Sequence, residues 1–305
     1  MDPVLDDVSF VTFNMVPMIK SNNKVVNIYK NFAYSGDGMD GLKIDDDFLQ
    51  HTLGMFSNPF FDMKKLQPGD YEVILDPETS GFLIHEVLGH LLEGDLVYNH
   101  PAYLEEKIKI GKQISIEEFT VIDDPTLENM AGSYFYDDEG NPGKKVLLIK
   151  KGRIHEFLHS MDTAKQLKQS NNGHARSIEY HLLPYVRMSN TYIQSGDASF
   201  DDIVSNTKKG VYLKNCMFAK SDMERFQVFP KEAYLIKNGK IIYPVTPPVA
   251  YGNIFDVLKN IEIIANDLQF YNVACTKGYS NAWILVTVGG VHLKVSKMTL
   301  GESIL

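Results

Sequence analysis

Residues 80–95 read SGFLIHEVLGHLLEGD, an apolar segment that carries two histidines and a glutamate between them. Neutral imidazoles bind Zn²⁺, and a carboxylate beside them can accept a proton from the water that zinc activates. His85 and His90 are five residues apart, however, whereas the ligands of the common H-E-x-x-H signature are four apart. The segment therefore predicts a helix with a metal site, and its spacing needs a structural explanation.

A straight α-helix does not place His85 and His90 on one face, because about 100° of rotation per residue separates them by about 140°. One extra residue in the turn, a π-bulge, would restore a common face, and such bulges are frequent at functional sites. Gly89 has no Cβ and makes that distortion less costly. The alternative is an ordinary amphipathic helix with incidental histidines. Its core-facing residues would be Phe82, Leu83, Val87, Leu88, Leu91 and Leu92.

Composition limits the class of protein. The chain has 305 residues, is 44% hydrophobic and 23% charged, and has a net charge of −9. This acidic balance argues against nucleic-acid binding, which needs clustered Lys and Arg. We expect no membrane span and no signal peptide, since no run approaches about 18 apolar residues and the start lacks a basic and apolar leader. Two cysteines, Cys216 and Cys275, make no disulfide framework and favour a cytoplasmic setting.

The first part of the chain contains strand-like segments. Residues 8–15 and 24–34 are rich in β-branched and aromatic residues, and the turn residues 21–23 between them predict a hairpin. A helix is expected around 45–55. The strand 71–75 then leads into the motif helix, which Thr79 or Ser80 could cap.

The second half is mostly strand-like. Residues 145–159 predict a hairpin that turns at Lys151-Gly152, and residues 232–245 predict another at Asn238-Gly239, a strong type I′ signal. We expect further extended segments at 187–194 and 292–298 and helices at 160–168, 199–207 and 253–265. This pattern is typical of an α+β protein with a large antiparallel sheet.

At this point the residues resemble a known family, the TldD/PmbA metallopeptidases, once described as modulators of DNA gyrase. The resemblance is to the metal-binding TldD type. The matching motifs occur in the family's order: HEVLGHLLEGD (85–95), VIDDPTL (121–127), DDEGNP (137–142), RMSNT (187–191), EAYLIKNGKI (232–241) with Pro244-Val245, and NDL (266–268) shortly before Cys275. So many motifs in order are more specific than the helix motif alone.

The resemblance implies one zinc ion per chain, held by His85, His90 and Cys275, with Glu86 as the general base. Three protein ligands leave a fourth position open for water, which suits a catalytic zinc. Glu93 is the competing third ligand, and Cys216 is a weaker rival because it falls where the family has a glycine-rich loop.

Arg187, Asn190 and Thr191 match a polar motif of the family and are predicted to line the substrate cleft. The alternative for Arg187 is a structural ion pair with a nearby carboxylate such as Asp123 or Asp124. The histidines outside the motif are expected to be structural or solvent-exposed: His155, His159, His174, His181 and His292.

The chain departs from the family in two ways. The family's region ahead of the motif is about twice as long, so residues 1–70 resemble a truncated α/β lead-in and residues 71–305 the C-terminal metal-binding domain. That domain is expected to be rich in antiparallel sheet, with the metal motif on a helix. In the family, paired subunits enclose the active site, which implies a homodimer or a heterodimer with a related subunit. The stretches 216–224 and 279–290 also differ from the family pattern.

The implied function is zinc-dependent hydrolysis of unfolded or short peptides, held as an added strand at a sheet edge. The alternative is a non-catalytic scaffold subunit with a residual or structural zinc. Glu86 favours the peptidase, because a structural site needs no base and closes its fourth position. A gyrase or nucleic-acid modulator is disfavoured by the acidic charge.

Overall fold

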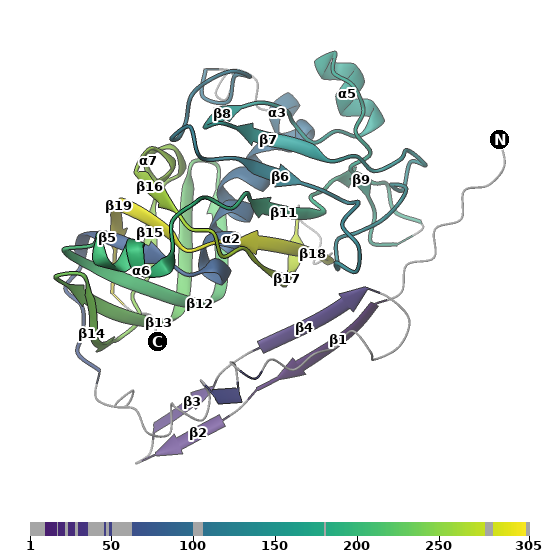
Figure 1. Cartoon of the computed structure of the whole chain (residues 1–305). Coiled ribbons are helices and arrows are strands. Elements are labelled where there is room, and N and C mark those ends of the chain that lie inside the picture. The colour runs from purple at the N-terminus through teal and green to yellow at the C-terminus, as the bar shows by residue number, and fades with distance from the viewer. Residues whose placement is uncertain are drawn as a thin grey trace.

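The computed structural model describes residues 10–16, 18–21, 24–27, 30–35, 46, 49–50, 63–99, 106–179, 181–277 and 283–302. Short helices lie between and around two mixed sheets (Figure 1). The helical elements are α2 (Pro77–Ile84), a π-helical turn (His85–Gly89), a 3₁₀ turn (His90–Leu92), α3 (Gly94–Asn99), α5 (Met161–Leu167), α6 (Phe200–Ser205) and α7 (Ile254–Lys259). Among the described residues no helix is both long and apolar enough to cross a membrane.

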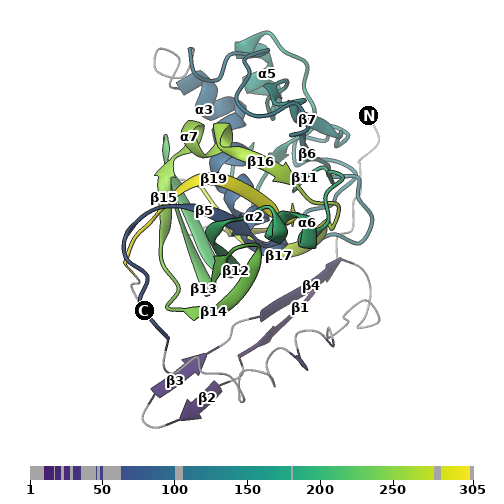
Figure 2. The same ribbon diagram turned by 60° about the vertical axis from the view of Figure 1, so that its left-hand side comes forward.

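One sheet closes on itself. Its strands are β5 (Gly69–Leu75), β12 (Lys209–Asp222), β13 (Arg225–Lys237), β14 (Lys240–Val245), β15 (Ala250–Asn253), β16 (Ile261–Ile264) and β19 (Leu293–Leu300). The order β12-β5-β19-β15-β13 returns to its start because β12 also pairs with β13. The result is a small barrel, with β14 and β16 as additional strands at its sides (Figure 2).

The other large sheet has the order β17-β18-β11-β6-β7-β8. Its strands are β6 (Val121–Asp123), β7 (Val146–Lys150), β8 (Arg153–Ile154), β11 (Asn190–Ile193), β17 (Gln269–Thr276) and β18 (Trp283–Gly290). Most pairings in both sheets are antiparallel, as expected, but β12–β5 and β11–β18 are parallel. The fold is therefore α+β with mixed sheets. In each sheet one pairing is parallel, and it joins two strands that are distant in sequence.

Helix α2 lies between the barrel and the six-stranded sheet, and nearly all of it is buried. The predicted N-cap at Thr79 or Ser80 is wrong. Asp76 is the N-cap, since its carboxylate accepts a hydrogen bond from the Thr79 amide at 2.8 Å, and Pro77 occupies the first turn. Ser80 instead donates to the carbonyl of Val291 at 2.7 Å. The helix therefore starts directly after β5, which aims it between the two sheets.

The predicted π-bulge is confirmed, since residues His85–Gly89 form a π-helical turn. The reason for glycine at position 89 is different from the expected one. Gly89 has helical dihedrals, φ −53° and ψ −61°. A Cβ there would lie 1.8 Å from Sδ of Met188, so glycine is required by close packing and not by an unusual backbone conformation.

Several other predicted elements are confirmed. The hairpin β7–β8 turns at Lys151 and Gly152, and β13–β14 turns at Asn238 and Gly239, with positive φ at all four residues. The helices predicted near 160–168 and 199–207 are α5 and α6. The helix predicted over 253–265 is wrong in its second half, because α7 ends at Lys259 and β16 pairs with β19.

Shorter pairs complete the described structure: β1 (Phe10–Met15) with β4 (Lys30–Ser35), β2 (Met18–Ser21) with β3 (Lys24–Asn27), and β9 (Ala175–Arg176) with β10 (Tyr185–Val186). The first two pairs agree with the predicted N-terminal hairpin. Of the helix expected around 45–55, Asp46, Leu49 and Gln50 are helical. Its other residues, and the turn residues Asn22 and Asn23, lie outside the described residues.

Candidate metal centre

Three potential metal ligands predicted from the sequence lie together. One ligand atom from each of His85, His90 and Cys275 falls within 4.8 Å of the others. Nε2 of His90 is 3.6 Å from Sγ of Cys275, and the two imidazole rings have centroids 5.0 Å apart. His85 and Cys275 are buried, whereas the side chain of His90 is 19% exposed. The cluster is therefore open to a cleft on the side of His90.

The fold brings the three side chains together through α2. His85 begins the π-helical turn that follows α2, and His90 comes directly after that turn as the first residue of the 3₁₀ turn. Cys275 lies one residue before the end of β17. Helix α2 packs closely on β18, since a Cβ on Gly81 would lie 3.3 Å from the backbone of Gly289 and Gly290. Strand β17 pairs with β18 along its whole length. The close approach of α2 to β18 thus sets the π-helical turn beside the end of β17.

Glu93 lies on the far side of His90 from the cysteine. Its Oε2 is 3.3 Å from Nδ1 of His90, while Nε2 of the same ring faces Cys275. When the proton is on Nδ1, this N–H donates a hydrogen bond to Glu93, and the lone pair of Nε2 is free to bind a metal. This arrangement is common in zinc sites. Glu93 therefore orients a candidate ligand and is not part of the ligand group. Cys216 is also outside that group and is buried in β12.

Electrostatics favour a thiolate at Cys275. Burial alone would raise its pKa, but the neighbouring His90 and His85 outweigh burial and hold the pKa well below its usual range. Burial likewise would lower the pKa of His90, yet Glu93 and Cys275 raise it well above the ordinary value. Burial would raise the pKa of Glu93, whereas Lys277 and His90 together lower it. Without a metal, these shifts favour a protonated His90 beside a Cys275 thiolate, and a bound zinc ion would take the place of the proton on Nε2 of His90.

The donor set fits zinc. Two imidazoles and a thiolate are the ligand types that Zn²⁺ prefers, and three of them leave one position open. In addition, Nδ1 of His85 is buried and has no hydrogen-bond partner among the described residues. A buried nitrogen without a partner is unfavourable unless a ligand engages the ring. The residues present therefore suit the metal that the sequence predicts.

Glu86 follows His85 directly and lies half-buried in a cleft of about 380 Å³. Ser221 of β12 donates a hydrogen bond to its Oε2 at 3.1 Å. The cleft is lined by residues from the π-helical turn and the segment that follows it into α3, from the tip of the β12–β13 hairpin and from the end of β17: Glu86, His90, Leu91, Glu93, Leu96, Ala219, Lys220, Ser221, Asp222, Met223, Thr276 and Lys277. Glu86 and His90 thus face the same solvent-accessible space.

Arg187 lies behind Cys275. Its Nη2 donates to the backbone carbonyl of Cys275 at 2.6 Å, and within the described part of the chain it forms no ion pair with Asp123 or Asp124. Asp123 pairs instead with Nε2 of His174 at 3.1 Å, and both side chains are fully buried. Neither of the two aspartates suggested as ion-pair partners of Arg187 therefore pairs with it.

Asn190 and Thr191 are buried near β6 and are not in the cleft lining. Nδ2 of Asn190 donates to the carbonyl of Asp124 at 2.7 Å, and the hydroxyl of Thr191 donates to Asp123. These contacts hold β11 against β6 and the loop that follows it. A substrate contact by Asn190 or Thr191 stays a prediction, and their geometry favours a positioning role.

The other histidines follow the expected pattern. His174 and His159 are buried in hydrogen-bonded positions, and His292 contacts Asp267 and the hydroxyl of Tyr212. His155 and His181 lie beside exposed glutamates. None of them belongs to the metal-ligating group found in the described residues.

Sequence reasoning missed two residues beside the site, Ser221 and Lys277. Ser221 belongs to a stretch that was noted only for its departure from the family pattern. Lys277 follows Cys275 by two residues, but a single lysine at the end of a strand has no recognisable signature. Both contacts join segments that are more than 130 residues apart, so only the tertiary structure reveals them.

Comparisons with known proteins show which family the chain belongs to. Residues 68–302 match the family described as PmbA/TldA metallopeptidase C-terminal domain. A protein named metalloprotease from Methanocaldococcus jannaschii is 36% identical over 255 residues, which cover 81% of this chain and 56% of the relative. A protein named zinc metalloprotease TldD homolog from Saccharolobus solfataricus is 32% identical over 235 residues, covering 76% of this chain and 52% of the relative.

The chain thus spans about half the length of these curated relatives. The crystal structure of TldE from Thermococcus kodakarensis superposes with a TM-score of 0.71 at 17% identity, covering 96% of this chain and 63% of that one. This likeness concerns the fold. With the family match over most of the chain and the identity to metalloproteases, it follows that the chain belongs to the TldD/PmbA metallopeptidase family.

Proposed function

We propose that this chain is a zinc-dependent peptidase that binds one zinc ion through His85, His90 and Cys275 and uses Glu86 as general base. The observation that supports this most directly is the convergence of three ligand atoms within 4.8 Å beside a cleft that contains Glu86. The family membership and a relative named zinc metalloprotease agree with it.

Each residue has a defined task in this proposal. His85 and His90 act as neutral imidazoles and Cys275 as a thiolate, while Glu93 accepts the Nδ1 proton of His90. When bound, zinc acidifies a water molecule and polarises the scissile carbonyl. Glu86 removes a proton from the attacking water at a carboxylate oxygen and later delivers it to the leaving amine. Ser221 orients the Glu86 carboxylate through its hydrogen bond to Oε2.

The proposed substrates are unfolded or short peptides. Strand β17, which carries Cys275, pairs only with β18 among the described strands and so forms an edge of its sheet. An extended peptide could add to that edge through main-chain hydrogen bonds, which gives affinity with little sequence preference. Its backbone would then run past the candidate metal ligands.

A partner subunit is part of the proposal, either a second copy of this chain or a related TldD/PmbA-type protein. The support is membership of a family in which, as the resemblance implies, paired subunits enclose the active site. The division into residues 1–70 and a metal-binding domain at 71–305 belongs to the same proposal, and the family match over residues 68–302 agrees with it. We expect sedimentation to show an oligomer. An active monomer at nanomolar concentration would contradict this part.

The test of the metal centre uses three proteins: the unmodified chain, Cys275→Ala and Glu86→Gln. We expect one zinc per chain in the unmodified protein and in Glu86→Gln, and zinc loss in Cys275→Ala. Peptide cleavage should fall by at least about 10²-fold in Glu86→Gln, because general base catalysis contributes about 10²–10⁴-fold. Zinc-replete Glu86→Gln with full activity would refute the role of Glu86. Stoichiometric zinc without any cleavage in the unmodified chain would favour the scaffold alternative.

A further inference from the structure

Lys277 connects the two segments that carry the candidate metal ligands. Its Nζ lies 2.8 Å from Oε2 of Glu93, 2.7 Å from both carboxylate oxygens of Asp95, and 2.7 Å from the carbonyl of Val186. Lys277 follows Cys275 by two residues, and Glu93 follows His90 by three. The ammonium group therefore joins the end of β17 to the segment just after the π-helical turn.

The contacts continue to the ligands themselves. Oε2 of Glu93 contacts both Lys277 and Nδ1 of His90, so the lysine is one hydrogen-bonded step from an imidazole. On the other side, the chain after Val186 continues to Arg187, which donates to the carbonyl of Cys275. The backbone around Cys275 is thus held from two directions.

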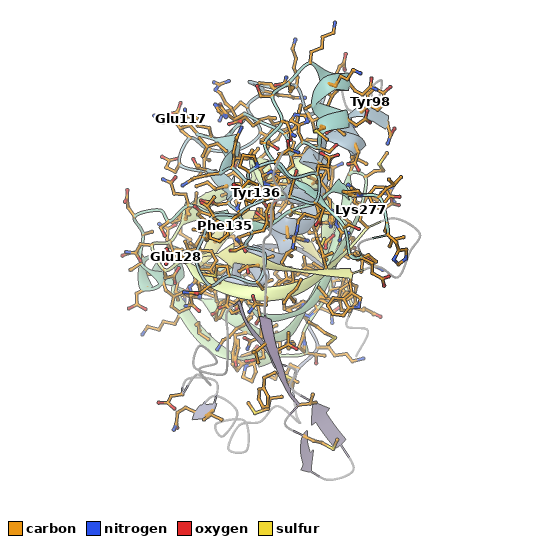
Figure 3. All side chains as sticks on the ribbon, turned by 90° about the vertical axis from the view of Figure 1, so that its right-hand side faces the viewer. Tyr98, Glu117, Glu128, Phe135, Tyr136 and Lys277 are labelled. Carbon is orange, nitrogen blue, oxygen red and sulfur yellow. The ribbon has the colours of Figure 1, made fainter. Side chains whose placement is uncertain are left out.

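The environment makes these bonds stronger than surface ion pairs. The Glu93 side chain is 2% exposed, and those of Lys277 and Asp95 are 21% and 22% exposed. Lys277 is labelled on the face shown in Figure 3, below Tyr98 of α3. Within this partly buried cluster one ammonium group lies between two carboxylates. Without it, Glu93 and Asp95 would face each other without a positive charge between them.

We propose that Lys277 is a positioning residue for the zinc ligands. Its bonds to Glu93 and Asp95 hold Sγ of Cys275 close enough to Nε2 of His90 for one zinc ion to bind both, before the metal arrives. This inference rests on the proposed function, since it requires that zinc occupies the three-residue site. A site whose ligands are already ordered binds a metal more tightly, because less conformational entropy is lost on binding. Mutation of a residue that hydrogen-bonds to a zinc ligand typically lowers the metal affinity by ten- to a hundredfold.

The test replaces Lys277 with methionine, which keeps a long apolar chain but removes the charge. Lys297→Met is the matched control, because it breaks a Lys–Asp contact of 3.0 Å that is exposed and lies away from the cleft. Zinc affinity is measured by competition with a chromogenic chelator. We expect Lys277→Met to bind zinc about ten- to a hundredfold more weakly, and Lys297→Met to match the unmodified protein.

Cobalt(II) substitution provides a second measurement that a merely structural role would not change. The thiolate-to-cobalt charge-transfer band reports whether Cys275 is a ligand. We expect this band to weaken per bound cobalt in Lys277→Met, and Lys277→Arg, which keeps the charge, to restore it at least in part. Thermal unfolding of the metal-free proteins shows whether any change follows from a general loss of stability.

Lys277→Met with unchanged zinc affinity and a full charge-transfer band would overturn the proposal, as would a loss of thermal stability with normal affinity. Should Lys277→Met fail to fold, Asp95→Asn removes one of the same bonds, and unchanged zinc affinity there would equally overturn it. If the unmodified protein binds zinc but cleaves no peptide, the proposed peptidase activity fails while the role of Lys277 is still decided by the affinities. Unmodified protein that binds no zinc would refute both.

Discussion

Gly89 ends the π-helical turn that separates the two candidate histidine ligands, and it packs against the side chain of Met188. The turn adds one residue to a helical repeat and thereby compensates for the five-residue spacing of His85 and His90. Met188 is fully buried two residues before β11, and it occupies the space that a side chain at position 89 would need. The ligand spacing and the absence of a Cβ are therefore two parts of one local arrangement.

We expect Gly89→Ala to destabilise the protein by about 1–3 kcal/mol and to weaken zinc binding, because the new methyl group overlaps Sδ of Met188 and must displace the turn. Urea unfolding and zinc titration measure the two effects. Met188→Ala is the matched second change, since it removes the overlapping group. The double variant should lose less stability than the sum of the single changes. Strict additivity would show that the contact is not the cause.

At the scale of elements, the start of α2 determines where the metal ligands lie. Asp76 is 3% exposed and accepts two backbone hydrogen bonds, from Thr79 at 2.8 Å and from Asn215 of β12 at 2.9 Å. The Asp76 amide in turn donates to the carbonyl of Leu213. One side chain thus ends the β5–β12 pairing and begins the helix, which fixes the direction of α2.

Asp76→Ala should lower the free energy of unfolding by about 2–4 kcal/mol, because it removes a helix cap and leaves the backbone amide of half-buried Asn215 without its acceptor. Ser199→Ala is the control, since Ser199 caps the exposed start of α6 in the same way. Loss of that cap should cost only about 1 kcal/mol. Equal losses in the two variants, measured by urea unfolding, would argue against the dual role of Asp76.

One short apolar segment, residues 261–264, forms a strand where the sequence predicts a helix. Residues 261–264 read IEII and continue the helical pattern of α7, so a helix over 253–265 was the natural prediction. In the structure, Asn260 ends the helix and β16 pairs with β19 across a bulge. A run of four apolar or charged residues fits either element, and the available partner strand decides between them.

At the scale of the whole molecule, buried histidines couple stability to pH. Burial, together with the nearby His174, lowers the pKa of His159 from 6.5 to about 4. The folded protein therefore favours neutral His159, whereas the unfolded chain takes up a proton near pH 6.5. Its contribution to stability is present above pH 6.5 and is lost as the pH falls toward 4.

We expect the unmodified protein to unfold more easily at pH 5 than at pH 7, and His159→Gln to show a smaller loss over this range because glutamine does not titrate. The measurement is the free energy of unfolding at several pH values with excess zinc present. His181→Gln is the control, since the side chain of His181 is 55% exposed. An identical pH dependence in His159→Gln and the unmodified protein would count against this assignment.

The sequence by itself determined the α+β class, the hairpins at Asn238-Gly239 and Lys151-Gly152, the helix motif and its π-bulge. These follow from local rules: turn residues tolerate positive φ, and ligand spacing has a fixed angular consequence. Family resemblance added Cys275, which no local pattern connects to the histidines.

Only the tertiary structure decided which groups surround the ligands. Glu93 was a candidate ligand in the sequence but lies behind His90, and Arg187 donates to the carbonyl of Cys275. Ser221 reaches Glu86 from β12, and Lys277, just after β17, reaches Glu93. The parallel pairings of β5 with β12 and of β11 with β18 were likewise invisible. The physical reason is that these contacts depend on how α2 packs between two sheets, and residue spacing along the chain carries no information about that packing.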